Sequence, residues 1–231
     1  MEVRNKTVLI TGGTRGLGLA LAIELQARGA RVGIVGQHIG RLQEIAAQLG
    51  VLAIRADVGD KDAIHKIVGE AQAALGPIDI VIHNASTLGA TPLRGLLDSD
   101  CEDLERVLAV NLVGPFRLSK ALAAGMLVRG QGALVHISSD AALDNYPSWG
   151  AYGVSKAALD HLSRQWAVEL PQLRVLAIDP GEMNTDMHRE ALPDADPSTL
   201  ANPTEIARRI VRIIEDERYA SGSRMRAAEV V

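Results

Sequence analysis

Short aliphatic and β-branched runs alternate with longer segments of helical periodicity along the chain, and this alternation limits the fold more than any other feature. Buried strands are predicted at residues 7–11, 31–35, 51–56, 78–82, 133–138 and 174–178. Helices are predicted at residues 16–28, 41–49, 60–75, 103–128, 151–170 and 205–215, and residues 223–227 are a candidate seventh strand. Near-continuous apolar strands separated by helices indicate an α/β fold with a parallel sheet that helices cover on both faces.

Composition excludes several classes of protein. The 231 residues fit one domain, so 1–231 is expected to be a single unit. The formal net charge of −4 argues against a nucleic-acid partner, because phosphate binding needs a basic face. The apolar runs are too short to span a membrane, and one cysteine and six scattered histidines offer neither an intramolecular disulfide nor a metal-ligand set. No secretory signal precedes the first strand, so a cytoplasmic location is expected.

The first predicted strand runs into a glycine-rich turn, Thr-Gly-Gly-Thr-Arg-Gly-Leu-Gly at residues 11–18. Gly12, Gly16 and Gly18 let the backbone turn tightly and approach a pyrophosphate, and the helix that follows offers free N–H groups to that anion. Such a turn alone is weak support, but its place between the first strand and the first helix predicts a dinucleotide site. The spacing differs from the common G-x-G-x-x-G pattern, and no Lys-Ser or Lys-Thr follows, which excludes a nucleoside-triphosphate loop.

The residues after the second strand bear on which dinucleotide binds. An acidic residue there normally holds the ribose hydroxyl of NAD, but this chain has Gly36, Gln37 and His38. Arg15, inside the glycine turn, is placed to meet the ribose phosphate of NADP. NADP(H) is therefore preferred, and NAD(H) is the alternative, with Arg15 then a solvated loop charge. Asp57, after the third strand, is a candidate partner of the adenine amino group or else a turn residue.

Tyr152 and Lys156 lie four residues apart on one predicted helix and therefore share a face. A phenol with a pKa of about 10 is a poor acid or base at neutral pH, and a nearby ammonium lowers that pKa. Tyr-x-x-x-Lys also occurs by chance as a surface pair. Ser139, at the carboxyl end of the fifth strand, favours a functional pair because its hydroxyl can bind a substrate carbonyl oxygen. Ser138 is the rival, but neighbouring strand residues point to opposite faces and the spacing favours Ser139.

Together these motifs resemble the short-chain dehydrogenase/reductase family, in its single-domain form. The resemblance covers nearly the whole chain and rests on residues 11–18, Asp57, Val58, Asn84, Ala85, Asn111, Ser139, Tyr152, Lys156, Pro180, Gly181 and Thr185. It implies a Rossmann-type doubly wound parallel sheet of seven strands in the order 3-2-1-4-5-6-7, with helices on both faces. It also implies hydride transfer between a nicotinamide and a carbonyl or alcohol carbon.

The resemblance assigns catalytic roles to four residues. Tyr152 would be the general acid/base, and Lys156 would lower its pKa and hold the nicotinamide ribose. Ser139 would orient the substrate carbonyl. Asn111 would position a backbone carbonyl and a water that feed a proton relay to Lys156.

The resemblance also implies the cofactor contacts. The expected contacts are Gly12, Thr14, Arg15, Gly16, Leu17, Gly18, Gln37, Asp57, Val58, Asn84, Ala85, Tyr152, Lys156, Pro180, Gly181 and Thr185. Of these, residues 57–58 would meet adenine, and residues 180–185 would border the nicotinamide, with Thr185 near its carboxamide.

The substrate side departs from the family pattern. His83 and Ser86 stand where the family has Asn and Gly, and His83 is expected to be a packed strand-end residue. The substrate loop, about residues 187–203, is short, and residues 189–203 are expected to form a surface loop before the last helix.

Asp144, Tyr146 and Trp149 lie between Ser139 and Tyr152, where they form either a pocket wall or a surface turn. Glu182 and Asp186 either disfavour anionic substrates at the mouth or are solvated loop charges.

The sequence therefore predicts an oxidoreductase that acts on a small-molecule carbonyl or alcohol that it does not identify. A non-catalytic dinucleotide-binding sensor or scaffold is the alternative, although it has no need of a proton relay. A sugar-nucleotide epimerase or dehydratase would need a larger C-terminal domain than the residues after Pro180 provide. A homodimer or homotetramer is expected, because the outer faces of helices 103–128 and 151–170 are apolar. The residues concerned are Leu112, Phe116, Leu159 and Trp166, some of which must belong to the core.

Overall fold

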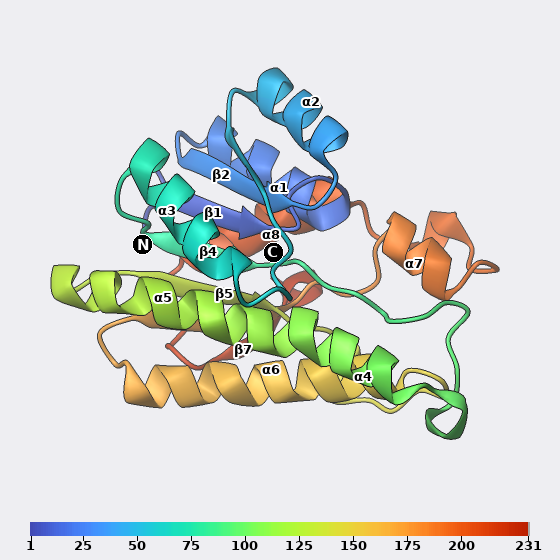
Figure 1. Ribbon diagram of the computed structural model, residues 1–231. Helices are drawn as coiled ribbons and strands as arrows, with labels where there is room; N and C mark the ends of the chain where they lie inside the picture. Colours follow the sequence, from blue (N-terminus) through green and yellow to red (C-terminus); the bar gives the residue numbers. More distant parts are fainter. Residues whose placement is uncertain (231) are drawn as a thin grey trace.

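Seven parallel strands form one sheet in the order β3-β2-β1-β4-β5-β6-β7 in the computed structural model, which describes residues 1–230 (Figure 1). The strands are β1 (Thr7–Thr11), β2 (Arg31–Gly36), β3 (Leu52–Arg55), β4 (Ile80–His83), β5 (Ala133–Ile137), β6 (Arg174–Asp179) and β7 (Arg224–Arg226). The predicted strand order is confirmed, including the seventh strand. The order reverses between β1 and β4, which opens a crevice at their carboxyl ends, where ligands bind in such sheets.

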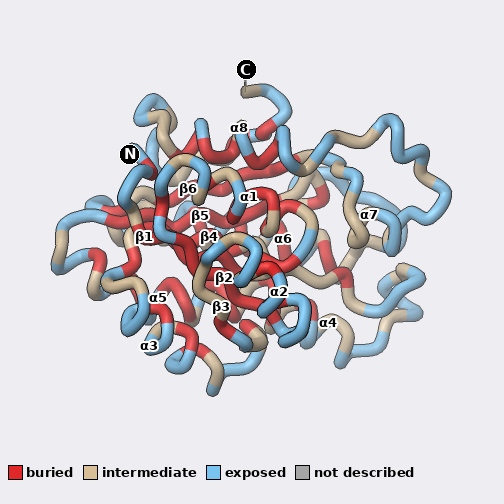
Figure 2. Tube along the Cα trace, turned by 90° about the horizontal axis from the view of Figure 1, so that it is seen from above, coloured by how far each residue is buried: buried red, intermediate tan, exposed pale blue. Residues whose placement is uncertain are grey.

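Helices cover both faces of the sheet. They are α1 (Gly16–Ala27), α2 (Ile39–Leu49), α3 (Ala63–Leu75), α4 (Cys101–Leu108), α5 (Gly114–Arg129), α6 (Gly150–Glu169), α7 (Asp186–Ala191) and α8 (Pro203–Glu215). One apolar core packs α1, α2 and α8 against the sheet, and a second packs α3, α5 and α6 against its other face. Figure 2 shows the buried sheet between α8 and α1 on one side and α3 and α5 on the other. The strands consist of aliphatic residues because both of their faces are covered.

The helix predicted at residues 103–128 is continuous but irregular. It runs from Cys101 to Arg129 and contains a π-helical turn, Ala109–Val113, just before Pro115. Pro115 has no N–H to donate to the carbonyl of Asn111, and its ring crowds that carbonyl, so the preceding turn widens. The irregularity therefore falls one turn before Pro115. By length and composition Cys101–Arg129 could cross a membrane, but half of its most apolar window is buried in the protein.

The outer faces of α5 and α6 are partly apolar. Phe116 is exposed and stacks on Trp166, with 5.7 Å between the ring centroids. Val154 and Val168 on α6 are exposed as well. Of the four residues named for these faces, Leu159 belongs to the core, because its side chain is only 1% exposed.

The segment expected as a surface loop at residues 189–203 is partly helical. It contains the end of α7 and a single 3-10 turn, Pro197–Thr199. Backbone hydrogen bonds join the two ends of this segment. Asn184 N donates to Ala201 O at 3.0 Å, and Ala201 N donates to Glu182 O at 3.1 Å. The segment between these two hydrogen bonds contains α7 and places it at the mouth of the crevice (Figure 1).

Candidate active site

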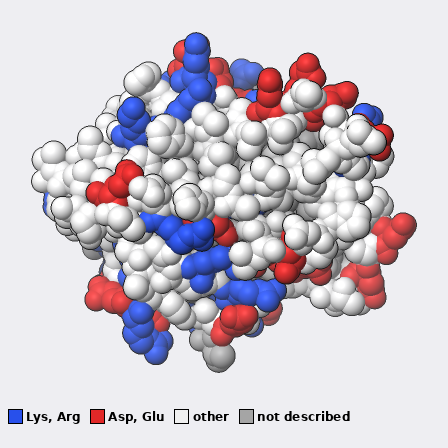
Figure 3. Space-filling model, turned by 90° about the horizontal axis from the view of Figure 1, so that it is seen from below, with Lys and Arg blue, Asp and Glu red and all other residues white. Residues whose placement is uncertain are grey.

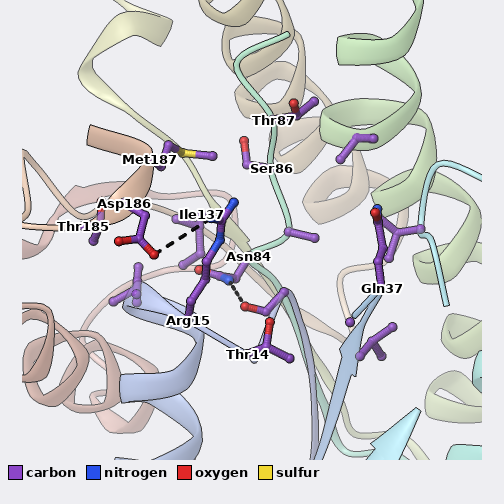
Figure 4. Close-up of a pocket in the computed structure, with 18 of the residues that line it drawn as sticks. Thr14, Arg15, Gln37, Asn84, Ser86, Thr87, Ile137, Thr185, Asp186 and Met187 are labelled. Atoms are coloured by element: carbon purple, nitrogen blue, oxygen red, sulfur yellow. Dashed lines mark hydrogen bonds and ion pairs between the residues drawn. The ribbon is translucent and has the colours of Figure 1, made fainter. Parts of the chain in front are cut away.

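A cavity of about 350 Å³ lies at the carboxyl ends of the central strands (Figure 4). Most of the expected cofactor residues line it: Gly12, Thr14, Arg15, Gly16, Leu17, Gln37, Val58, Asn84, Ala85, Tyr152, Lys156, Pro180 and Thr185. The other expected site residues do not line it: Gly18, Asp57, Asn111, Ser139 and Gly181. The glycine turn and the Tyr-Lys pair, far apart in the sequence, thus share one cavity.

The glycine turn is held by Asn84 from the end of β4. Gly12 and Gly16 have left-handed φ angles of 70° and 53°, which favour glycine. The Asn84 side-chain amide donates to Thr11 O at 3.0 Å and to Gly12 O at 3.1 Å. A Cβ on Gly18 would lie 2.5 Å from that amide nitrogen and would collide with Gly12 O. Gly18 therefore lets α1 approach the turn, although it does not face the cavity.

The N-terminal end of α1 offers a site for an anion. The helix begins at Gly16, its first turn has no acidic residue, and Arg15 before it makes no side-chain cap. The free N–H groups and the positive end of the helix dipole therefore face the cavity uncompensated, as a pyrophosphate requires.

Arg15 reaches from the glycine turn to α7. Its Nη1 lies 3.5 Å from Glu190 Oε1 and 3.9 Å from Asp186 Oδ2, and all three side chains are about half exposed (Figure 4). Such ion pairs are weak, so the guanidinium is available to a stronger anion. Gln37 and His38 complete this end of the cavity without a carboxylate.

Asp57 is engaged within the protein. Its Oδ2 lies 2.6 Å from Arg106 Nη2, and its Oδ1 accepts from Gly59 N at 2.8 Å. Arg106 lines the cavity, and Asp57 does not. Arg106 could not be predicted from the sequence, because its partner is 49 residues away in the chain. The sequence also did not point to Thr87, Met183 or Met187, which line the cavity as well.

Tyr152 and Lys156 are both buried on α6 beside the end of β5. Lys156 Nζ donates to Ile137 O at 2.8 Å and lies 5.5 Å from the centroid of the Tyr152 ring. Burial lowers the pKa of Lys156 to about 8, and the charges of Asp160 and Asp179 oppose that shift.

The pKa of Tyr152 is raised in the structure, whereas the sequence predicted that Lys156 lowers it. Burial, the largest cause, raises the pKa of Tyr152 to about 12, although the Ser139 hydroxyl lowers it. The ammonium of Lys156 is turned to the Ile137 carbonyl, where the phenol gains little from it. Tyr152 is therefore a protonated phenol at neutral pH in this structure.

Ser139 is fixed by its own turn. Its hydroxyl donates to Asp140 Oδ1 at 2.8 Å and accepts from Ala141 N at 3.2 Å. Ser138, the rival, is buried and lines the cavity, with its hydroxyl 3.5 Å from the carbonyl oxygen of Ser139. Asp140 and Ser139 are thus coupled, and Asp140 is a residue that the sequence did not single out.

Asn111 ties the π-helical turn to its surroundings. Its Oδ1 accepts from Thr87 N at 2.9 Å, and its Nδ2 donates to Thr87 O at 2.9 Å and to Ser155 Oγ at 3.0 Å. The side chain is buried, and Pro115 leaves its backbone carbonyl without the usual helical donor. Asn111 therefore joins the cavity wall to α6 at Ser155, the residue directly before Lys156.

His83 is packed at the end of β4, as expected. Its ring stacks on that of His136, with 4.9 Å between centroids and 10° between planes, and its Nε2 lies 2.8 Å from Ser119 Oγ. Among residues 1–230, no group of three or more His, Cys, Asp or Glu side chains is arranged to hold a metal ion.

Comparison with known proteins gives the class of this chain. Residues 6–196 match the family model described as short chain dehydrogenase. L-rhamnose 1-dehydrogenase (NAD(P)(+)) of Azotobacter vinelandii is 33% identical over 96% of this chain and 95% of its own length. Inactive 2-(S)-hydroxypropyl-CoM dehydrogenase 2 of Xanthobacter autotrophicus is 37% identical over 75% of this chain and 76% of its own. A short chain dehydrogenase structure from Shigella flexneri complexed with NADP has a TM-score of 0.91 and 25% identity, and the match covers 98% of both chains.

The chain belongs to the short-chain dehydrogenase/reductase family. Within that family it is an NAD(P)-dependent oxidoreductase.

Proposed function

We propose that the protein reduces a small-molecule carbonyl compound, or oxidises the matching alcohol, with NADP(H) as its preferred cofactor and Tyr152 as general acid/base. The observation that carries the proposal is the burial of Tyr152 and Lys156 together in the cavity that also holds the glycine turn. A phenol and an ammonium in such a place can move one proton at the point where a carbonyl oxygen becomes a hydroxyl.

The residues present fit a dinucleotide. Gly12 and Gly16 open the turn, and the uncompensated start of α1 would hold the pyrophosphate. Arg15 would exchange its weak contacts to Glu190 and Asp186 for the ribose phosphate of NADP. Bound NADP(H) supplies or accepts the hydride.

The remaining contacts extend along the cavity. Val58 would lie against adenine, with Asp57 holding Arg106 beside it. Residues 84–85 would line the middle, and residues 180–185 would border the nicotinamide end, where Pro180 and Thr185 face the cavity. Gly18 and Gly181 would act through the shape of their turns.

The raised pKa of Tyr152 suits proton donation during carbonyl reduction, because the phenol keeps its proton at neutral pH. Ser139 would orient the carbonyl oxygen once its hydroxyl, which donates to Asp140 in the ligand-free protein, turns to donate to the substrate. Lys156 would donate to the nicotinamide ribose and return a proton to Tyr152. Asn111 would hold the relay water through its backbone carbonyl.

The test compares the natural chain with Tyr152→Phe. The natural chain is expected to oxidise NADPH in the presence of aldehydes or ketones. The loss of NADPH absorbance measures this reaction. The variant should bind NADPH with an unchanged Kd and lose at least about a thousandfold in kcat. If the variant keeps most of its turnover, the assignment of Tyr152 is wrong.

A non-catalytic dinucleotide sensor is the second candidate, and the relative named inactive is the observation that favours it. A sensor of this kind should bind NADPH tightly, and none of the aldehydes, ketones and quinones in a test panel should oxidise the bound NADPH. Turnover of any member rejects it.

We also propose that the chain forms a homo-oligomer through α5 and α6. Figure 3 views the molecule from the α6 side and shows a broad area without charged side chains. Phe116, Val154 and Val168 are exposed on these helices, and apolar patches of this kind mark interfaces. Light scattering after size-exclusion chromatography should give a dimer or tetramer, and Val154→Glu should give the monomer.

A further inference from the structure

Three aromatic rings form a path from Tyr152 to the surface. The Trp149 ring meets Tyr152 edge-on, with 5.6 Å between centroids, and the Tyr146 ring meets Trp149 edge-on at 6.4 Å. Tyr152 is 8% exposed, whereas Tyr146 is 44% exposed. A ligand bound against the outer rings of this series would contact aromatic faces and edges.

Aliphatic side chains from other elements close around the inner rings. Leu93, before α4, and Met187 and Ala191, on α7, pack against the cluster that contains Tyr152. Met187 also lines the cavity, and Figure 4 shows its side chain pointing toward Ser86 across from it. The wall beside the phenol is thus apolar on the side of α7 as well as on the side of Trp149.

Apolar side chains continue outside the cavity. A side chain on Gly150 would collide with Leu96, so Leu96 lies against the start of α6, next to Trp149. Leu97, beside it in the chain, is 98% exposed, and Leu143 is exposed in the loop that leads to Tyr146. Leucines in water at a site entrance favour a ligand that covers them with apolar surface.

Carboxylates stand at the outer end of the aromatic path. The Tyr146 hydroxyl donates to Asp140 Oδ2 at 3.0 Å. This bond and the charge of Asp140, followed by the charges of Asp144 and Glu182, raise the pKa of Tyr146. Three carboxylates therefore act on the same hydroxyl at the mouth.

The arginines of the neighbouring segments each lie near a carboxylate, which offsets part of their charge. Arg226, whose charge acts on Asp140, lies 3.5 Å from Asp179 and 3.9 Å from Glu229. Arg94 lies 3.7 Å from Asp100, and Arg189 pairs with Asp186. The carboxylates at the mouth are thus only partly offset, and a substrate anion would meet repulsion there.

We infer that the substrate is an uncharged, apolar carbonyl compound with an aromatic group, and that compounds with a carboxylate, phosphate or sulfonate group are poor substrates. This inference rests on the proposed function, since it names the substrate class of the same site. Of the two interpretations of Glu182 that the sequence allowed, the inference selects the first, in which its charge disfavours anionic substrates.

The kinetic test uses three ketones of one size and different charge: para-methylacetophenone, para-acetylbenzoate and para-(trimethylammonio)acetophenone. With NADPH, kcat/KM for the neutral ketone is expected to exceed that for the carboxylate by about tenfold or more at low salt. The cation should also exceed the carboxylate. An equal or higher kcat/KM for the carboxylate overturns the inference and leaves the proposed function intact.

A binding test distinguishes a failure of the proposed function from a failure of the inferred substrate class. Trp149 fluorescence is measured in the NADPH complex of a Trp166→Phe chain, in which Trp149 is the remaining tryptophan. The neutral ketone should quench it at a concentration about tenfold lower than the carboxylate does. If NADPH is not oxidised but this order holds, the proposed function fails and the ligand class stands. If the neutral ketone does not quench, or quenches no better than the carboxylate, the ligand class is wrong.

Charge removal tests the mouth itself. Glu182→Gln should lower the neutral-to-carboxylate ratio of kcat/KM by about threefold. Glu169→Gln, at the far end of α6, removes the same charge and should leave the ratio unchanged. An unchanged ratio in Glu182→Gln, or an equal fall in both variants, contradicts a local repulsion at the mouth.

Discussion

Arg224 on β7 donates from Nε to Asp160 Oδ2 on α6 over 2.8 Å, and both side chains are largely buried. Its Nη2 also donates to Asp179 Oδ2 at 3.2 Å and to Ser139 O at 2.7 Å. Asp160 lies one turn after Lys156, and Asp179 directly precedes Pro180. One guanidinium from the C-terminal strand thus joins the ends of β5 and β6 to α6 beneath the proposed active site.

Removing this guanidinium should destabilise the fold strongly. Arg224→Met leaves Asp160 and Asp179 buried without their main partner, which is expected to lower the free energy of unfolding by about 3–5 kcal/mol. Urea unfolding at neutral pH measures the change. Arg224→Met combined with Asp160→Asn should recover part of the loss, because one of the two uncompensated charges is gone. A loss of less than about 1 kcal/mol in the single variant would contradict the role of Arg224 as a buried counter-ion.

The proton affinity of Lys156 should set the alkaline limit of carbonyl reduction. Burial lowers its pKa to about 8, so the ammonium is lost as the pH rises through 8, and kcat/KM for reduction should fall there. Asp160 raises the pKa of Lys156, so Asp160→Asn should move this limit to lower pH. The measurement is the pH profile of kcat/KM in both chains. A limit that stays in place or moves to higher pH would show that Asp160 does not act on Lys156.

The sequence predicted the elements and the main site residues because their signals are local. The alternation of apolar strands and helices determines a doubly wound sheet, and the glycine turn follows directly from β1. Contacts between distant segments carry no such signal. The pairs Asp57–Arg106 and Asp160–Arg224 join residues 49 and 64 positions apart, so neither could be predicted from spacing.

Two features of α6 were beyond the reach of the sequence for the same physical reason. The sequence left open whether Leu159 lies in the core, and it predicted that Lys156 lowers the pKa of Tyr152, which is wrong. Both depend on how other elements pack on α6: the neighbouring segments bury Leu159, and burial together with the Ile137 carbonyl changes the electrostatics of the pair. The π-helical turn before Pro115 likewise depends on how the helix accommodates a missing donor, which periodicity does not reveal.

The stacked pair of His83 and His136 should make the protein less stable in mild acid. Burial lowers the pKa of His136 to about 3 and lowers that of His83 well below its ordinary value. Below pH 6.5 these histidines are protonated in the unfolded chain and remain neutral in the folded chain. Each of them therefore lowers the free energy of unfolding by about 1.4 kcal/mol for every pH unit by which the pH falls. His136→Asn should therefore reduce the slope of stability against pH between about 6.5 and 5. His65→Gln, on the exposed side of α3, should leave the slope unchanged, and equal slopes in all three chains would contradict the prediction.

A methyl group at Gly18 should impair cofactor binding. Its Cβ would lie 2.5 Å from the Asn84 amide nitrogen, so the glycine turn must shift. Gly18→Ala is expected to raise the Kd for NADPH at least about tenfold and to lower the free energy of unfolding by about 1–3 kcal/mol. Gly69→Ala, on α3, meets nothing within 4 Å and should raise the free energy of unfolding by about 0.5–1 kcal/mol with an unchanged Kd. Calorimetric titration and urea unfolding measure both quantities, and NADPH affinity retained in Gly18→Ala would reject the close approach of α1 to the turn.

Arg15 should decide between NADPH and NADH through competition with α7. The guanidinium lies 3.5 Å from Glu190 and 3.9 Å from Asp186, and these half-exposed contacts are weak enough for a ribose phosphate to replace them. Arg15→Ala is expected to raise the Kd for NADPH about tenfold and to change the Kd for NADH by less than about threefold. Glu190→Gln should lower the Kd for NADPH, because the phosphate then meets one competitor fewer. Titration of both cofactors into the three chains separates the outcomes: equal losses for NADPH and NADH in Arg15→Ala would mean that Arg15 binds a group common to both cofactors.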